Sequence, residues 1–233
     1  LAAEPEDVHF TSGSTQGIEL AFAHALGTAR TLPLRVALSR VEHPAVIDIA
    51  AKAAKQGLAT LSWLEVHRDG SLDMEVLEGV LASGIDLVCL MAANNEAGMI
   101  YPVDAVFQKA SSMGARMLVD ATQAAGRVDL NLSSTPFDYL VLSGHKMYAP
   151  KGIGALVSCT YHSRDNHGIL DSHRSTPNVP GIVGLGAACR LMTDRGAEDE
   201  KRIQGFRDAL ERDLRDLVPG LVVNGNGHRL SGN

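Results

Sequence analysis

The alternation of short apolar runs with amphipathic segments is the feature that most constrains the fold of this chain. Apolar runs of strand length recur along most of the sequence, and segments with helical spacing of their apolar residues separate them. This alternation is typical of βαβ units, in which helices connect parallel strands of one sheet. With 233 residues, the chain fits one large α/β domain.

The predicted elements place several polar segments at the ends of strands. The predicted strands are Val8–Phe10, Arg35–Ser39, Thr60–Glu65, Asp86–Met91, Met117–Asp120, Tyr139–Leu142 and Gly154–Val157. The predicted helices are Gln16–Ala25, Ala45–Lys55, Met74–Leu81, Val103–Met113 and Glu198–Leu217. The last helix has charges nearly all round and one narrow apolar stripe, by which we expect it to pack on a surface. Because ligands in open α/β sheets bind beyond the carboxyl ends of strands, the polar residues there are the candidate site.

Composition excludes several classes of function. The net charge of -6 argues against nucleic acid as a partner, because phosphate binding needs a basic surface. The three cysteines, Cys89, Cys159 and Cys189, have no CxxC spacing, so we expect neither a disulfide framework nor a metal site. Cys89 lies in an apolar run and is predicted to be a core residue. No apolar stretch has the length of a membrane span, and we expect a cytoplasmic protein without membrane contact.

A lysine and an aspartate follow two of the apolar strands. Ser143-Gly144-His145-Lys146 closes the strand that begins at Asp138, and Asp120 ends another strand. A lysine held beside a sheet with little water has a lowered pKa, and its neutral amine can attack a carbonyl to form a Schiff base. A lysine on the aldehyde and an aspartate on the pyridine nitrogen are the pair that holds pyridoxal phosphate (PLP). On local grounds alone, Lys146 also fits a solvated loop charge and Asp120 a helix N-cap.

The segment Ser12-Gly13-Ser14-Thr15 follows a strand and opens a helix. Its backbone amides and hydroxyls would face an anion at the helix N-terminus, where the helix dipole also favours negative charge. Serine and threonine also start helices for purely structural reasons, so a plain N-cap is the alternative.

The chain resembles a known family in several collinear blocks. These blocks are Phe10-Thr11-Ser12-Gly13-Ser14-Thr15, Val41-Glu42-His43, Asn94-Asn95-Glu96-Ala97-Gly98, Val119-Asp120-Ala121-Thr122-Gln123 and Ser143-Gly144-His145-Lys146. Their order and spacing are similar to those of cysteine desulfurases and selenocysteine lyases, in the class V aminotransferase superfamily of PLP fold type I. The resemblance runs from about Val8 to Gly186. It implies a large PLP-binding α/β domain at residues 1–190, with a mostly parallel central sheet flanked by helices. Residues 191–233 would begin a C-terminal small domain that is largely missing.

The resemblance also implies roles around the cofactor ring. Lys146 would form the Schiff base, and His43 would stack on the pyridine ring and move protons. Asp120 would pair with the pyridine nitrogen and Gln123 would hydrogen-bond the ring hydroxyl. Asn95 would approach the ring and the substrate carboxylate. Taken alone, a single histidine and an asparagine-rich turn are more often structural.

A second set of residues is implied at the phosphate of the cofactor. Ser14, Thr15, Ser143 and His145 would hold this phosphate. Thr176 would reach the phosphate of a neighbouring subunit, which makes a homodimer part of the site, although locally Thr176 lies in a plain Ser/Thr/Pro loop. Lys151 is the nearby alternative to Lys146, and the family pattern assigns it to a turn before the next strand.

The implied activity is conversion of L-cysteine to L-alanine, with sulfur passed to an enzyme thiol and on to a sulfur-acceptor protein, as in iron–sulfur cluster assembly. Two features depart from the family. The segment before Thr176 is shorter and lacks a glycine-rich stretch, of which His167-Gly168 could be the remnant, and Arg174 is displaced, with His173 at the usual arginine position. The acceptor thiol and a substrate-binding arginine belong to the small domain, and none of the three cysteines occupies the matching region.

Two alternative functions stay open, and a third is rejected. A selenocysteine lyase or another class V aminotransferase would share the cofactor site. A degenerate, non-catalytic homologue would bind a partner or dimerise without turnover. A dinucleotide-binding fold is not supported, because Gly152-Ile153-Gly154 lacks the third glycine and precedes a strand.

Overall fold

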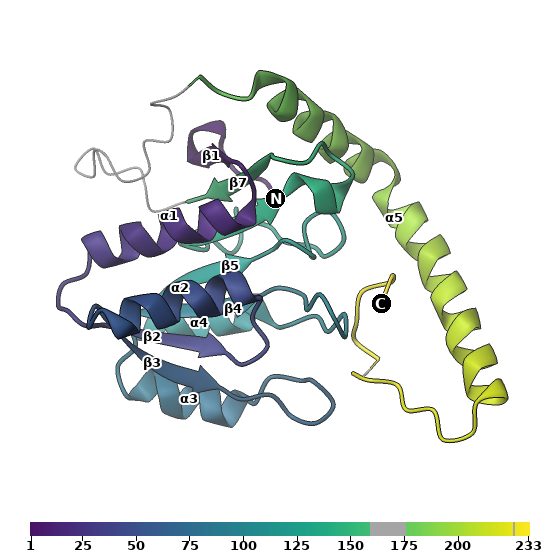
Figure 1. The fold of residues 1–233 in the computed structure, drawn as a ribbon, viewed down its shortest axis with the longest axis horizontal. Helices are drawn as coiled ribbons and strands as arrows, with labels where there is room; N and C mark the ends of the chain where they lie inside the picture. The colour runs from purple at the N-terminus through teal and green to yellow at the C-terminus, as the bar shows by residue number, and fades with distance from the viewer. Residues whose placement is uncertain (159–175, 226) are drawn as a thin grey trace.

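The fold is built on one seven-stranded sheet with the strand order β1-β7-β6-β5-β4-β2-β3, here in a computed structural model of the protein (Figure 1). The structure describes residues 1–158, 176–225 and 227–233. The strands are β1 (Val8–Thr11), β2 (Leu34–Ser39), β3 (Ala59–Leu64), β4 (Leu87–Met91), β5 (Arg116–Asp120), β6 (Tyr139–Ser143) and β7 (Gly154–Val157). The helices are α1 (Ser14–Gly27), α2 (Pro44–Lys55), α3 (Met74–Ala82), α4 (Val103–Ser112) and α5 (Val179–Leu217), with short 3-10 helices η1 (Pro5–Asp7) and η2 (Gly144–Met147).

The sheet is mostly parallel, as the sequence predicts, with one exception. Strands β3, β2, β4, β5 and β6 pair in parallel, whereas β7 is antiparallel to both β6 and β1. A parallel pair needs a long crossover, usually a helix, and β6 and β7 are joined only by η2 and a tight turn. The mostly parallel sheet that the sequence predicts therefore has its antiparallel strand at β7.

Two apolar layers cover the two faces of the sheet. Alternate residues of β2 belong to different layers: Val36 and Leu38 pack with α1 and α2, whereas Ala37 packs with the residues of α3 and α4. This alternation follows from the two-residue period of a strand. Cys89 is fully buried in the layer under α1 and α2, which confirms its prediction as a core residue.

Helix α5 is much longer than the sequence predicts. It starts at Val179 rather than Glu198, so the predicted start is wrong. Val179-Pro180-Gly181 has the composition of a loop, but proline is accommodated in a first helical turn and the Asn178 side chain caps the helix by accepting from the Gly181 amide at 3.1 Å. The predicted domain boundary at residue 190 falls inside this helix and stays a prediction.

The two halves of α5 have different surroundings. Leu185 and Ala188 in the first half are buried in the core. In the second half the predicted apolar stripe is exposed, with Phe206 at 66% and Leu210 at 60% of their free surface. The expectation that this stripe packs on a surface is therefore wrong within the described residues.

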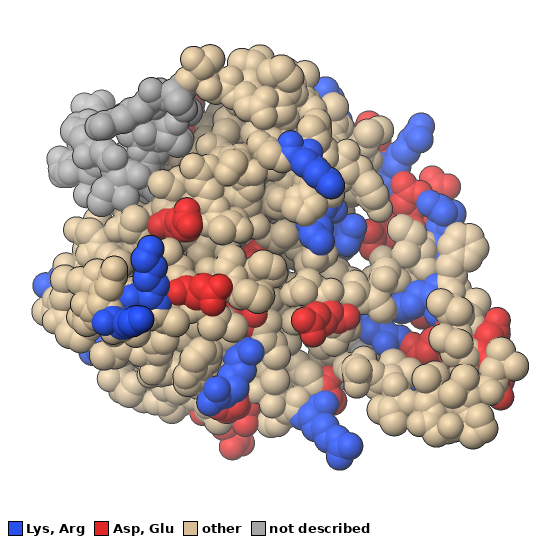
Figure 2. Space-filling view, viewed as in Figure 1, with Lys and Arg blue, Asp and Glu red and all other residues tan. Residues whose placement is uncertain are grey.

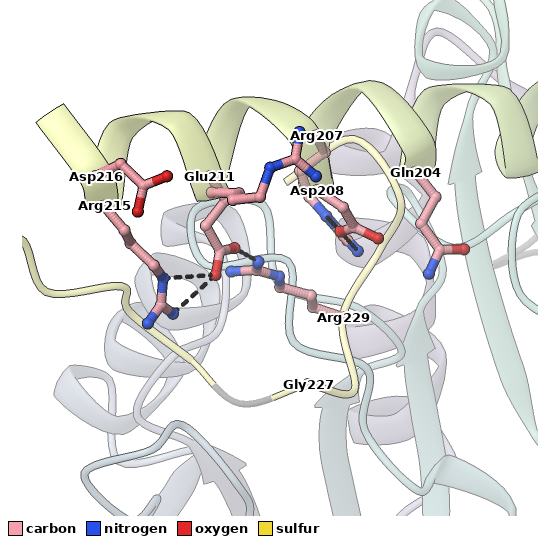
Figure 3. Close-up of a pocket in the computed structure, with 9 residues that line it drawn as sticks. Gln204, Arg207, Asp208, Glu211, Arg215, Asp216, Gly227 and Arg229 are labelled. Carbon is pink, nitrogen blue, oxygen red and sulfur yellow. Dashed lines mark hydrogen bonds and ion pairs between the residues drawn. The ribbon is translucent and has the colours of Figure 1, made fainter.

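The C-terminal segment, residues 227–233, runs between the second half of α5 and the loop after β4. Arg207 donates from Nη1 to the Leu230 carbonyl at 2.6 Å, and Glu211 binds both Arg215 and Arg229 (Figure 3). On the other side, the Leu230 amide donates to the Gly98 carbonyl at 2.8 Å. The side chains of Arg207, Glu211, Arg215 and Arg229 are among those that line a cavity of about 480 Å³, whose walls contain both basic and acidic groups. The segment thus connects α5 to the loop that carries Asn95.

Charged side chains of both signs are interspersed on the face drawn in Figure 2 rather than gathered by sign. None of the helices within the described ranges is long and apolar enough to cross a membrane.

Candidate active site

A cavity of about 260 Å³ opens at the carboxyl ends of β2, β4, β5 and β6. It collects residues that are far apart in the sequence, as expected for ligand sites in open α/β sheets. Among the predicted residues, its lining contains Ser14, Thr15, His43, Asn95, Asp120, Gln123, His145 and Lys146. The sequence did not single out three further lining residues, which are Met91, Ala93 and Thr122.

Lys146 lies on η2, immediately after β6. Buried residues on both sides, Gly144 and Met147, hold this short helix against the sheet. Its main-chain carbonyl accepts a hydrogen bond from Arg127 Nη2 at 3.2 Å. The lysine side chain itself is half-buried and lines the cavity.

Asp120 ends β5 and is only 6% exposed. Burial raises the pKa of this carboxyl, and interactions with Thr122 and His43 lower it in part. Oδ1 accepts from the Thr122 amide at 2.9 Å, so Asp120 also fulfils the structural capping role that its position allows. No Lys or Arg of the described residues forms an ion pair with it. A buried carboxyl without a cation favours a ligand that brings one.

His43 is the N-cap of α2, and one nitrogen of its exposed ring is held by a backbone hydrogen bond. Nδ1 accepts from the Ala45 amide at 3.2 Å. Because Nδ1 accepts, the neutral ring carries its proton on Nε2. His43 is therefore both a helix cap, which is its structural alternative, and a part of the cavity wall.

The two neighbouring asparagines after β4 have different roles. Asn94 is buried, and its Oδ1 accepts from the amides of Glu96 and Ala97 at 2.9 and 2.8 Å. It thereby fixes the turn. Asn95 is exposed and lines the cavity. Asn94 thus shapes the loop and leaves the Asn95 side chain to face a ligand.

A second cavity of about 540 Å³ adjoins the first, since Ser14, Thr15 and His145 line both. Its other walls come from the start of α1, from Ser143, and from Lys151 with Gly152. The N-cap of α1 is a glycine, Gly13, so no side chain caps the first amides of this helix. Free amides, hydroxyls and a lysine together suit an anion.

Two close contacts shape this second cavity. Ser143 Oγ and His145 Nδ1 lie 2.8 Å apart. A side chain at Gly154 would lie 2.7 Å from Gly13 Cα and 2.6 Å from the Leu142 carbonyl oxygen, so only glycine lets the segment before α1 approach β7. The position of the predicted phosphate residues therefore depends on this close approach.

Some predicted residues do not join the two cavities. Thr176 is exposed and lines neither of them. Cys159, His167, His173 and Arg174 lie outside the described residues. Cys89 is buried in the core and Cys189 lies on α5, so neither of these thiols lines the cavity of Lys146.

Lys151 and Glu42 are the residues that sequence reasoning underrated. Lys151 lies in the predicted turn, but it also lines the second cavity. A cation beside a Ser/Gly-rich helix start was the available signal. Glu42 was part of a recognised block without an assigned role, and it is fully buried behind His43.

The groups around the two cavities fit the chemistry of PLP. A half-buried amine on Lys146, an unpaired buried carboxyl on Asp120 and a separate anion-binding wall match an aldehyde, a pyridine nitrogen and a phosphate. Residues 1–231 match the Aminotransferase class-V family. The chain belongs to this family. Its members depend on PLP, which agrees with the donor groups found here.

Similar proteins carry more specific names. The chain is 37% identical over 235 residues to cysteine desulfurase 2 of Trichormus variabilis, covering 97% of this chain and 57% of that protein. Among solved structures, a NifS-like protein superposes with a TM-score of 0.86 at 26% identity, covering 98% of this chain and 64% of that one. DndA from Streptomyces lividans superposes with a TM-score of 0.85 at 30% identity, covering 99% and 67%. The chain thus spans a little over half the length of the curated relatives it matches.

Proposed function

We propose that this chain is the cofactor-binding part of a PLP-dependent cysteine desulfurase, which converts L-cysteine to L-alanine and passes the sulfur to an enzyme thiol. The observation that carries the proposal is that Lys146 and Asp120, from different strand ends, line one cavity. The substrate is inferred from the 37% identical relatives that carry the name cysteine desulfurase.

In this proposal the cofactor, when bound, supplies an electron sink for the bonds of the substrate. Lys146 would supply the amine that holds the aldehyde of the cofactor, and Asp120 would keep a proton on its ring nitrogen. The unpaired state of the Asp120 carboxyl supports this assignment, because a protonated ring nitrogen provides the cation that the buried carboxyl lacks. Gln123, on the turn after Asp120, would orient the ring through its hydroxyl.

The phosphate end would be held by the start of α1 and the end of β6. The first amides of α1 have no side-chain cap, and the hydroxyls of Ser14, Thr15 and Ser143 lie around the same cavity. His145 would keep the Ser143 hydroxyl aimed through their 2.8 Å contact. Lys151 adds a positive charge to this wall.

Two side chains can handle protons. Because Nδ1 of His43 accepts from a backbone amide, Nε2 is the atom free to donate or take a proton toward the cavity. Lys146 lines the same cavity, and its amine would be a second group able to carry protons there. Asn95 would contact the substrate carboxylate with its amide.

Three further properties stay predictions within this proposal. They are a homodimer in which Thr176 reaches the neighbouring subunit's phosphate, a sulfur-acceptor protein, and a cytoplasmic location. In this proposal the acceptor thiol belongs to the small domain, and neither Cys89 nor Cys189 lines the Lys146 cavity.

The test is the visible absorption spectrum of the purified chain with PLP, for wild type, Lys146→Ala and the control Lys52→Ala, an exposed lysine on α2 that lines neither cavity. We expect a yellow band that is lost in Lys146→Ala and kept in Lys52→Ala. A folded wild-type chain without such a band would overturn the proposal and favour the non-catalytic homologue.

Substrate choice is tested separately in the protein that includes the small domain. We expect alanine formation from cysteine to require Lys146. Alanine released from selenocysteine but not from cysteine would assign the selenocysteine lyase alternative instead.

A further inference from the structure

Glu42 is a buried carboxyl placed between the ends of two strands, one residue before His43. The residue is 5% exposed. Its Oε1 accepts from Ser39 Oγ at 2.6 Å and from the Met91 amide at 2.8 Å. Ser39 ends β2 and Met91 ends β4, and the paired residues of these neighbouring parallel strands end at Leu38 and Cys89. One oxygen of Glu42 therefore ties the two strand ends together beyond their last paired residues.

The hydrogen bonds of Glu42 are distributed as in a neutral carboxylic acid. Both donors go to Oε1, which has the two lone pairs of a carbonyl oxygen, whereas Oε2 is buried and contacts no partner among the described residues. No Lys or Arg in the described part of the chain forms an ion pair with this side chain, and an ionised carboxylate buried in this way is costly. In agreement, burial raises the pKa of Glu42 to about 8, with the two hydrogen bonds lowering it in part and Asp120 raising it further.

Glu42 lies directly behind the candidate active site. Met91, whose amide it holds, lines the cavity and is the register partner of Asp120. The next residue, His43, lines the same cavity. The titratable groups that interact with Glu42 from the packed elements are Asp120 on β5, Cys89 on β4 and Tyr101 after β4, and all of them are neutral or negative.

We propose that Glu42 is a positioning residue that acts as a neutral acid, fixing the ends of β2 and β4 so that His43 and Asp120 keep their places in the cavity. In this form it leaves Asp120 as the charged carboxylate beside the ring nitrogen. The consequence for the cofactor rests on the proposed function, whereas the protonation of Glu42 is tested without cofactor.

The first experiment compares PLP binding, measured by the visible band, in wild type, Glu42→Gln and Glu42→Ala. Glutamine keeps an acceptor oxygen and is neutral, so we expect an absorbance maximum and an affinity close to those of wild type. Alanine removes both hydrogen bonds, and we expect affinity to fall roughly tenfold. If Glu42→Ala does not fold, Glu42→Asp, whose oxygens are withdrawn by one methylene, takes its place. Glu19→Gln, at an exposed position on α1, is the charge-matched control.

The second experiment measures urea unfolding of the chain without PLP at pH 5 and pH 8.5. A carboxyl whose pKa is raised in the folded state stabilises the fold fully below its unfolded pKa, and this contribution is lost as pH rises through the folded value. We therefore expect Glu42→Gln to differ only slightly from wild type at pH 5, which lies just above the unfolded value of 4.5, and to exceed its urea midpoint by on the order of 1 M at pH 8.5. Glu19→Gln should show no such pH-dependent gap.

Three results would overturn the inference. They are a Glu42→Gln chain that binds PLP as poorly as Glu42→Ala, a Glu42→Ala or Glu42→Asp chain that binds PLP as well as wild type, and equal urea midpoints of wild type and Glu42→Gln at pH 8.5. A wild-type chain without a PLP band would overturn the proposed function instead, and the urea comparison would still decide the protonation state of Glu42.

Discussion

Carboxyl groups have opposite surroundings in two regions of the molecule, the carboxyl ends of the central strands and the second half of α5. Along α5, Glu211 binds two arginines, and Asp208 binds Arg207 at 2.7 Å. At the carboxyl ends of the central strands, Asp120 and Glu42 are almost completely buried, and no Lys or Arg of the described residues forms an ion pair with either.

This difference distinguishes carboxylates that form ion pairs on the surface from buried carboxyls that are available to a ligand. The ion pairs of α5 are partly exposed and screened by solvent, so each contributes little stability. The buried carboxyls of Asp120 and Glu42, which lack a Lys or Arg partner, decrease stability when they are ionised, because burial opposes their ionisation. Such a cost is typical of functional sites, where perturbed pKa values gather in a cavity.

The largest expected effect comes from Asp120→Asn. We expect PLP affinity to fall roughly 10- to 100-fold, because the substitution would remove the charge-assisted hydrogen bond that we propose between Asp120 and the ring nitrogen. Without PLP, the same variant should be more stable than wild type at pH 7, since the raised pKa of Asp120 makes wild type lose stability as pH rises. PLP titration and urea unfolding measure the two effects, and a variant that is less stable and binds PLP normally would contradict the account.

The close approach of two segments gives the next prediction. Gly154→Ala places a methyl group 2.7 Å from Gly13 Cα, and we expect a loss of about 1–3 kcal/mol in the free energy of unfolding. PLP affinity should fall as well, because the displaced segment carries Ser14 and Thr15. Gly79→Ala on α3 is the control for an added methyl group, at a glycine with nothing within 4 Å and without a positive φ. If Gly154→Ala loses stability while PLP affinity is unchanged, the phosphate assignment is wrong.

A smaller effect is expected at the end of β6. Ser143→Ala removes a hydroxyl from the anion cavity and its contact with His145. We expect PLP affinity to fall by up to about tenfold, from a net hydrogen-bond contribution of about 0.5–1.5 kcal/mol. The measurement is the PLP titration, with Ser112→Ala on the surface end of α4 as control. Equal affinities of Ser143→Ala and wild type would remove Ser143 from the phosphate set.

The smallest effect is expected on α5. Glu211→Gln removes two partly exposed ion pairs, and we expect a change of about 0.2–1 kcal/mol in stability without any change in the PLP band. Thermal unfolding and the absorption spectrum check this. A Glu211→Gln chain that loses its PLP band would show that the two regions are coupled rather than distinct.

The sequence predicted the strands more accurately than the helices. Every predicted strand was found to within two residues, because buried apolar runs between polar turns have one interpretation in an α/β chain. Helix α5 was half missed, since Pro180 and Gly181 suggested a loop while the Asn178 cap made them a helix start. The direction of β7 depends on the length of its connection, which the strand pattern does not contain.

The side chains that line the candidate site were mostly predicted, whereas Glu42, which lies next to it and lines neither cavity, was missed. His43, Asn95, Asp120 and Lys146 follow strand ends, so parallel topology brings them together. Glu42 had no role in the sequence interpretation. Its burial, and the hydrogen bonds that Ser39 and Met91 both donate to its Oε1, depend on three-dimensional packing that the sequence pattern does not contain.

The most direct test of the site is to treat the chain with PLP, reduce it with borohydride and map the modified peptide by mass spectrometry. We predict that the label is on Lys146, whose amine shares a cavity with Asp120. A label on Lys151, which lines the anion cavity instead, would contradict the assignment of the two cavities.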